Sequence, residues 1–269
     1  MSHHLASEIQ TPIPLRQHHF GQTGHWWQSA LMFLALLLLW EGAVRFGWLN
    51  RAFIAAPSEI YHQLVQLWNS GELLKHLAAS LKRLGFGFGL GSALGVLVGV
   101  MIGISRLARA TLLPLSSALF PVPKVALLPL FLVWFGIGEG SKIATIAFGT
   151  FFPTVIATYS AIDGVDRSLI RMGIAFGVPQ PTIIRHILLP GAMAGIFAGF
   201  RISISIAITL LVVAEMMNAH YGIGAYISNA GALYQIDQLL AGVVILALLG
   251  LVLGTLMTFI ERWILRWRN

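Results

Sequence analysis

The sequence predicts an all-α polytopic membrane protein with about six transmembrane helices. The first two observations are compositional: 57% of the 269 residues are hydrophobic and only 10% are charged. Soluble domains carry about 25% charged residues, and a soluble chain of this length could not bury so much apolar surface. The third observation is a series of apolar stretches, each close to or above the ~20 residues that cross a bilayer as a helix.

Six apolar stretches account for the predicted transmembrane helices. Tryptophans flank the first, with Trp26 and Trp27 on one side and Trp48 on the other, as aromatic residues do at the two surfaces of a bilayer. This stretch is too long for the core of a signal peptide, so we expect it to remain uncleaved. The six stretches occupy residues 27–47, 84–104, 111–137, 142–162, 191–214 and 238–261.

Residues 1–26 are predicted to form a polar cytoplasmic tail, and residues 27–269 the transmembrane domain. Five histidines lie in the tail, where the composition favours a disordered segment over a metal site. They are His3, His4, His18, His19 and His25. The chain contains no cysteine, which excludes disulfides and thiolate metal sites. We expect this chain to hold no metal.

The basic residues predict the orientation of the chain. The net charge is +7, but these residues lie in short clusters between apolar stretches, which does not indicate a nucleic-acid surface. With both termini inside, the inner segments hold nine, namely Arg16, Arg106, Arg109, Arg167, Arg171, Arg185, Arg262, Arg266 and Arg268. The outer segments hold six, namely Arg45, Arg51, Lys75, Lys82, Arg83 and Lys142. The positive-inside rule therefore favours both termini in the cytoplasm.

Two of the stretches carry small residues at every fourth position. Because lipid gives no hydrophobic drive between helices, such rows support close helix packing. We interpret them as packing within one chain, with a subunit interface as the alternative. The rows are Gly87, Gly91, Gly95, Gly99 and Gly103 in the second stretch, and Gly191, Gly195, Gly199, Ser203 and Ala207 in the fifth.

The third stretch is irregular and contains four prolines. Each interior proline removes a backbone hydrogen bond and clashes with the preceding turn, so we predict a bend or a break near residues 121–124. Broken helices at membrane depth lie against protein or a water-filled cavity. The break therefore indicates either a translocation pathway or a plain structural kink. The prolines are Pro114, Pro121, Pro123 and Pro129.

Three ionisable residues lie in or beside the membrane, namely Lys124, Arg201 and Glu215. A charge at the bilayer centre costs about 2.5–3.5 kcal/mol, so each should face a partner or water. One interpretation is that all three lie on a translocation path, where Lys124 and Arg201 attract an anion. The other is interhelical pairing or snorkelling to the interface.

Residues 163–190 form the longest inward segment. Asp166 is a suitable N-cap for a short helix that ends at Gly177, a natural C′ residue. Pro179 forces a turn, and Pro181 suits the first position of a second short helix. Two helices with an apolar face that project from the membrane suit a groove on a soluble partner.

This loop resembles the ATPase-docking loop in permease subunits of binding-protein-dependent ABC importers. The family pattern runs E-A-A, three residues, Gly, nine residues, then I-x-L-P. In this chain Gly177 is followed, after nine residues, by Ile187, Leu189 and Pro190 in the matching positions. The resemblance implies that the loop docks on the ATPase, and charge inserted at Ile187 or Leu189 is then expected to uncouple ATP hydrolysis from uptake.

The chain departs from the family pattern at one place. The E-A-A positions read Arg171, Met172 and Gly173, which puts the acidic contact at position 171 in doubt but not the docking itself. Permeases for nitrate, taurine and aliphatic sulfonates often lack the leading acid, and this chain resembles that subgroup. The resemblance also covers Pro121-Val122-Pro123, Trp134-Phe135-Gly136-Ile137-Gly138-Glu139, Ala214-Glu215 and Gly222-Ile223-Gly224.

The resemblance implies a type I ABC importer permease-like fold in a bacterial cytoplasmic (inner) membrane. It also implies two cytoplasmic ATP-binding cassette subunits, a second permease copy in a homodimer, and an extracytoplasmic solute-binding protein. ATP is then used by the partner, and this chain binds no cofactor. The implied function is import by alternating access of a small anion of the sulfonate, taurine or nitrate type.

Motifs for chemistry within this chain are absent from the sequence. The nearest approach to a phosphate-binding loop, Gly138-Glu139-Gly140-Ser141-Lys142, has serine where glycine must precede lysine. We therefore expect no ATPase or other enzyme activity of the chain's own. The alternative is a secondary transporter driven by an ion gradient, but the stretches offer few carboxylates for coupling. An intramembrane enzyme or a scaffold is favoured less, since the first lacks its motifs and the second leaves the loop unexplained.

Overall fold

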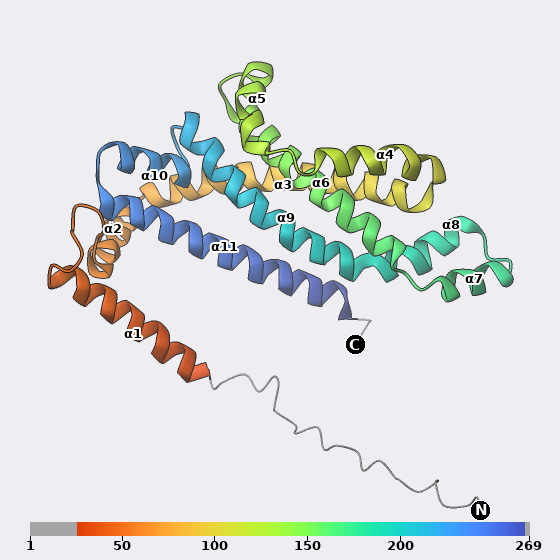
Figure 1. Cartoon of the computed structure of the whole chain (residues 1–269), viewed down its shortest axis with the longest axis horizontal. Helices are drawn as coiled ribbons and strands as arrows, with labels where there is room; N and C mark the ends of the chain where they lie inside the picture. The colour runs from red at the N-terminus through yellow and green to blue at the C-terminus, as the bar shows by residue number, and fades with distance from the viewer. Residues whose placement is uncertain (1–25, 267–269) are drawn as a thin grey trace, which may run out of the picture.

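The computed structural model describes residues 26–266, which fold into helices and turns with no strand in that range (Figure 1). The predicted tail of residues 1–26 lies outside the described part except for Trp26, the first residue of α1. The helices are α1 (Trp26–Arg45), α2 (Pro57–Asn69), α3 (Glu72–Ile104), α4 (Arg106–Leu119), the 3-10 helix η1 (Lys124–Leu127), α5 (Leu128–Phe135), α6 (Glu139–Asp163), α7 (Arg167–Ala175), α8 (Gln180–Ile183), the π-helix η2 (Ile184–Leu188), α9 (Leu189–Asn218), α10 (Ile223–Ala232) and α11 (Ile236–Ile264).

Each of the six predicted membrane stretches corresponds to one long helix or, for the third stretch, to a bent pair of helices. Within residues 26–266, five helices are long and apolar enough to cross a membrane, and they are α1, α3, α6, α9 with its preceding turns, and α11. The sixth stretch is the pair Arg106–Leu119 and Lys124–Phe135, which is bent by 91° at the break between them. The prediction of about six spans is confirmed, and so is the break predicted near residues 121–124.

One boundary prediction was wrong. The second stretch was expected to begin at residue 84, whereas α3 already begins at Glu72. Residues before 84 are too polar for an apolar stretch, yet they continue the helix because their side chains have partners. Lys75 pairs with Glu72 at 2.6 Å, and Ser80 and Arg83 point into the protein and are buried.

The centre of the molecule is a layer of long helices in which α6 lies between α3 and α9 (Figure 1). The predicted row of glycines on α3 faces α6: a Cβ added at Gly91 would lie 2.1 Å from Thr150 Oγ1, and Gly87, Gly95, Gly99 and Gly103 also face α6 closely. On the opposite side, Cβ atoms at Gly195 and Gly199 would lie 2.5 and 2.3 Å from the methyl groups of Ala161 and Ala157. The rows therefore pack within one chain, on two sides of a single helix.

Helix α6 is suited to this central place by small and β-branched residues. Thr145, Thr150 and Thr154 are buried, and each hydroxyl donates to a backbone carbonyl of the preceding turn. This satisfies their hydrogen-bonding groups inside the helix. The Thr154 hydroxyl also lies 2.9 Å from that of Ser203 on α9, so the fifth-stretch row meets α6 through a polar contact as well.

Helix α1 stands apart from this layer. In Figure 1 it lies at the edge of the molecule, joined to the rest through α2, and only 6% of its apolar stretch is buried. Its link to α2 is polar: Glu41 accepts hydrogen bonds from the backbone and hydroxyl of Ser58 and pairs with Arg45 at 2.5 Å. Most of the apolar surface of α1 is therefore left for lipid or for another subunit.

Candidate functional site

The loop 163–190 forms two helical limbs that extend beyond the ends of α6 and α9 (Figure 1). The first limb is α7, which begins as predicted at the cap Asp166. Its carboxylate accepts a hydrogen bond of 2.8 Å from the Ser168 backbone. That bond lowers the pKa of the Asp166 carboxyl, which keeps the cap charged.

The first limb ends at Gly177. Helix α7 stops at Ala175, and Gly177 takes a left-handed φ of +71° at the C′ position. The Gly177 and Val178 amides donate back to the carbonyls of Ile174 and Gly173 at 2.9 and 3.0 Å. This pair of bonds is the Schellman arrangement, which favours glycine at C′ because glycine has no Cβ to clash.

The second limb differs from the sequence expectation. Helix α8 begins at Gln180, so Pro181 is its second residue and not its first. The limb is also no separate helix, because η2 follows directly and leads into α9 without a break. Pro190 explains the π-helical turn. Its backbone nitrogen has no hydrogen to donate to the carbonyl four residues earlier, and its ring clashes with that carbonyl. A widened turn accommodates both effects.

Contacts between the limbs involve two of the predicted coupling residues. Gly173 is buried, and a Cβ there would lie 3.3 Å from Ile183 and 3.4 Å from Ile187. Ile187, Leu189 and Pro190 are half-buried. Gly173 and Ile187 therefore hold the two limbs together and present little surface outward.

The outward surface of α7 is formed by other residues. Arg171 is exposed, and Met172 is 50% exposed. Leu169, Ile174 and Phe176 expose 46, 61 and 80% of their surfaces, although all three are apolar. None of these three was predicted as a coupling residue; their signal was the presence of apolar residues in and next to a nine-residue helix, which is too short to span a membrane. Leu169, Met172 and the C-cap Phe176 lie on one side of the helix, and we call these three residues the apolar face of α7; Ile174 lies on another side.

The other end of the molecule contains a buried ionic network. The Glu215 carboxylate is fully buried and accepts from the Ser80 hydroxyl at 2.8 and 2.9 Å and from the Gly224 amide at 2.9 Å. Arg83, 4% exposed, pairs with Glu215 at 2.7 Å and makes two bonds of 2.7 Å to Glu139. The network joins α3, α6, α9 and the loop before α10.

Two neighbours on α3 bind the same loop. His76 and Ser80 lie four residues apart and therefore share a face of the helix. The Gly222 amide donates to His76 Nδ1 at 3.0 Å, and the Ile223 amide donates to the Ser80 hydroxyl at 2.9 Å. The loop needs glycine at 222, where φ is +144° and a Cβ would lie 2.4 Å from the Glu215 carboxylate carbon.

The three predicted path residues have separate surroundings. Lys124 lies at the break after α4, where its ammonium contacts the Phe120 carbonyl and lies 5.2 and 5.7 Å from the rings of Phe120 and Phe152. Arg201 pairs with Glu261 of α11 at 3.2 Å. Glu215 belongs to the buried network. The structure thus gives each residue its own partner, and their role in a path stays a prediction.

A charged cavity of about 580 Å³ adjoins the buried network. Lys82, Arg83, Glu139, Lys142 and His220 line it. The Lys142 side chain is 3% exposed and donates to the Gly138 carbonyl at 2.9 Å. Three cations and one carboxylate make the cavity electropositive, which favours an anion over a cation there.

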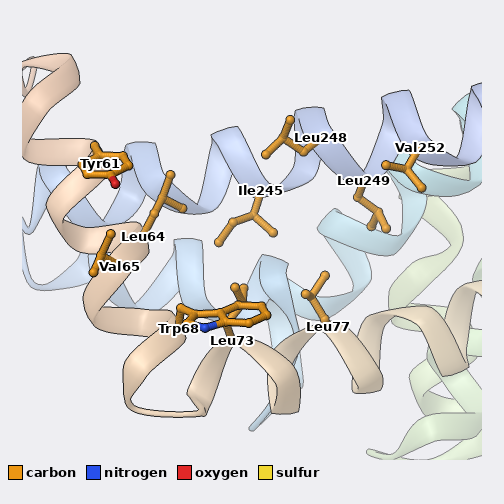
Figure 2. A pocket seen from close by; sticks show the side chains of 10 residues that line it. All are labelled: Tyr61, Leu64, Val65, Trp68, Leu73, Leu77, Ile245, Leu248, Leu249 and Val252. Atoms are coloured by element: carbon orange, nitrogen blue, oxygen red, sulfur yellow. The ribbon is translucent and has the colours of Figure 1, made fainter.

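A second groove is almost wholly apolar and does not suit a charged solute. It has a volume of about 520 Å³ and lies between α2, α3 and α11 (Figure 2). Figure 2 shows Tyr61 and Trp68 reaching in from α2, Leu77 from α3, and Ile245 and Leu249 from α11. With no charged residue in its lining, this groove resembles the lipid-facing surface and not a site for an anion.

Comparison with known proteins agrees with this geometry. Residues 91–268 match the model of the family described as binding-protein-dependent transport system inner membrane component. The aliphatic sulfonates transport permease SsuC of Escherichia coli is 38% identical to this chain over 87% of this chain and 89% of its own length. The SsuC permease of Bacillus subtilis is 35% identical over 93% of this chain and 91% of its own length. The taurine permease TauC of Escherichia coli is 30% identical over 87% of both chains.

Solved structures show the same fold. An inward-facing MetNI methionine ABC transporter structure has a chain that aligns with a TM-score of 0.60, at 22% identity, over 73% of this chain and 96% of its own. A chain of an amino acid ABC transporter aligns with a TM-score of 0.55, at 14% identity, over 76% of this chain and 97% of its own. This chain therefore belongs to the inner membrane components of binding-protein-dependent transport systems, as a multi-pass permease subunit of an ABC importer.

Proposed function

We propose that this chain imports an aliphatic sulfonate or a related small organic anion across a bacterial inner membrane. The observation that carries the substrate class is the similarity over most of the chain to two sulfonate permeases and a taurine permease. A sulfonate keeps its negative charge at any physiological pH. The electropositive cavity beside the buried network, with its buried Lys142, suits such a group on its way into the membrane.

The complex we propose contains two copies of this chain, two cytoplasmic ATPase subunits and an extracytoplasmic binding protein. The loop 163–190 lies in the cytoplasm with both termini, and the apolar face of α7 docks into a groove on the ATPase. The three exposed apolar side chains of this face are costly in water and gain free energy on burial, at about 25 cal/mol per Å². ATP-driven closure of the ATPases then moves this loop and switches access to the path.

The substrate test is uptake of radiolabelled taurine and an alkanesulfonate into vesicles that contain this chain with its cognate ATPase and binding protein. ATP-dependent sulfonate uptake is expected, and riboflavin should not compete. Riboflavin is an informative control because the permease RibX of Chloroflexus aurantiacus, named for riboflavin transport, is 35% identical to this chain over 87% of it. Riboflavin uptake without sulfonate uptake would reject the proposed substrate class.

The docking test uses the two kinds of loop residue that the structure separates. Met172→Asp and Phe176→Asp place charge on the apolar face of α7, so the ATPase should no longer copurify with the permease. Leu233→Asp is the matched control, because Leu233 is an equally exposed apolar residue at the opposite end of the bundle, 68% exposed. Retention of the ATPase by both α7 variants would show that docking uses another surface.

Variants at Ile187 and Leu189 are expected to act differently. Because both residues are half-buried and Ile187 packs against Gly173, charge there should loosen the loop itself. Protease cleavage within residues 163–190 should then increase in Ile187→Asp and stay unchanged in Phe176→Asp. Equal cleavage in the two variants would contradict this division between a docking face and an internal contact.

A further inference from the structure

A cavity at the loop end of the bundle carries a charge pattern that neither docking nor transport has used. It has a volume of about 660 Å³ and lies where several helices end. Three lining residues lie at the ends of their helices: Gly103 is next to last in α3, Asp163 is the last residue of α6, and Leu188 is the last residue of η2. Two others begin helices, Arg106 in α4 and Arg167 in α7. The cavity therefore lies at the level where the chain leaves the membrane.

The lining of this cavity is strongly basic. Arg106, Arg109, Arg167 and Arg171 contribute four positive charges and Asp163 one negative charge, which leaves a net charge of +3. Asp163 is already shared, since it pairs with Arg109 at 2.8 Å and lies 3.8 Å from Arg167. Among residues 26–266, no hydrogen bond or ion pair reaches the Arg106 guanidinium, and Arg171 has only a 3.4 Å bond to the Arg167 carbonyl.

The helix ends add to this imbalance. The N-terminus of a helix carries a partial positive charge and is stabilised by anions, yet α4 and α7 have no acidic residue in their first turns. Instead Arg106 and Arg167 occupy their first positions. Asp166 caps α7 through the Ser168 amide but does not line the cavity. An external anion would supply the charge that the N-terminus of α4 and the free arginines lack.

The remaining lining is apolar and indicates which anion fits. Ile162, Val165 and Leu188 are buried, and Ile170 is half-buried beside the arginines. These side chains pack against one another, so the wall that they present to the cavity is apolar and offers a free phosphate no donor. An anionic phospholipid brings a phosphodiester to the arginines and glycerol and acyl carbons to the apolar wall, and basic pockets between helices at the cytoplasmic surface bind such headgroups.

We propose that the cavity lined by Arg106, Arg109, Arg167 and Arg171 is a binding site for the phosphodiester headgroup of an anionic phospholipid. The lipid lies between α4 and α7 and neutralises the cluster. Because Arg167, Ile170 and Arg171 belong to α7, the bound headgroup fixes the docking helix against the membrane surface. This site is separate from the solute path and from the apolar face of α7.

The test is native mass spectrometry of the full chain released from nanodiscs of phosphatidylglycerol and phosphatidylcholine. Preferential retention of phosphatidylglycerol is expected. A basic residue near a membrane surface contributes about 1 kcal/mol, so Arg106→Gln should lower the affinity about fivefold. Asp163→Asn removes the competing carboxylate and should raise the affinity for phosphatidylglycerol. Arg266→Gln is the matched control, an exposed arginine at the same end of the bundle but outside the cavity, and should have no effect.

Several outcomes would overturn the proposal. Equal retention of both lipids, or an equal effect of Arg106→Gln and Arg266→Gln, would mean that the arginines act only as a diffuse surface charge. Displacement of phosphatidylglycerol by millimolar inorganic phosphate alone would assign the site to a free anion. If Arg106→Gln releases the ATPase without changing lipid retention, the cluster is part of the protein interface instead.

Discussion

At the residue scale, the buried pair of Arg83 and Glu215 determines how the end of the bundle opposite the loop is held. A buried carboxylate is stable only when its charge and lone pairs are matched, and Glu215 receives donors from two elements, α3 and α10. Arg83 also reaches Glu139, so one guanidinium ties the first residue of α6 to the last turns of α9. Removal of one partner should therefore cost more than the loss of an ordinary salt bridge.

The first prediction concerns this pair. Arg83→Met leaves Glu215 as an uncompensated buried charge, and the free energy of unfolding should fall by about 3–5 kcal/mol. The double variant Arg83→Met, Glu215→Gln should recover most of this loss, because no buried charge remains. Thermal unfolding in detergent, followed by tryptophan fluorescence, measures both.

The control for this prediction is an exposed pair on the same helix. Lys75→Met removes the partner of Glu72, and both side chains are well exposed, so little change is expected. A double variant as unstable as Arg83→Met alone would contradict the role of unpaired charge. Equal effects of Arg83→Met and Lys75→Met would show that burial of the pair is unimportant.

The sequence could not show this pairing. Arg83 and Glu215 are 132 residues apart, and each was interpreted by its own neighbourhood, Arg83 as an outer-segment charge and Glu215 as a path residue. Only the packing of α3 on α9 brings them together. The regular spacing of His76 and Ser80 was a usable signal, because two polar residues on one face of a helix that leads into a membrane need partners.

At the scale of single elements, the spacing of glycines was the most reliable sequence signal. It predicted close packing, and the structure places the row of α3 directly against α6. Lipid gives no solvent drive for this contact, so shape alone must supply it. A methyl group in the row should then disturb packing far more than a methyl group elsewhere on the same helix.

The second prediction compares two glycines of α3. A Cβ at Gly91 would lie 2.1 Å from Thr150 Oγ1 and 2.3 Å from the Ala147 carbonyl, whereas nothing lies within 4 Å of a Cβ at Gly89. Gly91→Ala should destabilise the protein by about 1–3 kcal/mol through overpacking. Gly89→Ala should be neutral or stabilising by up to about 1 kcal/mol, because alanine favours helix. Thermal unfolding in detergent of the two variants, side by side, gives the measurement, and equal stability would contradict packing through this row.

Helix ends and breaks were predicted unevenly. Pro121 and Pro123 correctly placed the break of the third stretch, whereas Pro114 lies inside the continuous helix α4. The start of α3 and the continuity of the second loop limb with α9 were missed. The start of α3 depends on tertiary partners of Ser80 and Arg83. The continuity of the limb depends on a π-helical turn before Pro190, where a proline alone predicts a break.

At the scale of the whole molecule, composition and stretch length were enough to predict the membrane class, and the loop spacing was enough to indicate the family. The fold follows from the order of the long helices. Helices α9 and α11 contain 30 and 29 residues, about 45 Å each, which exceeds the ~30 Å hydrocarbon core of a bilayer. Their ends must therefore emerge on both sides, and the two helices run in opposite directions.

The last prediction tests the orientation, which rests on the asymmetry of basic residues. The chain has no cysteine, so single exposed cysteines can be introduced without background. Asn229→Cys, in α10, should react with a membrane-impermeant maleimide on intact cells, while Thr182→Cys in α8 and Arg266→Cys after α11 should react only once the cells are permeabilised. The reverse pattern would invert the topology and place the loop 163–190 away from any cytoplasmic ATPase. Reaction of Thr182→Cys and Arg266→Cys on opposite sides would mean that α9 and α11 do not both span the membrane. Since the helix order puts these two positions at the same end of the bundle, the pair tests the fold, and Asn229→Cys independently tests its direction.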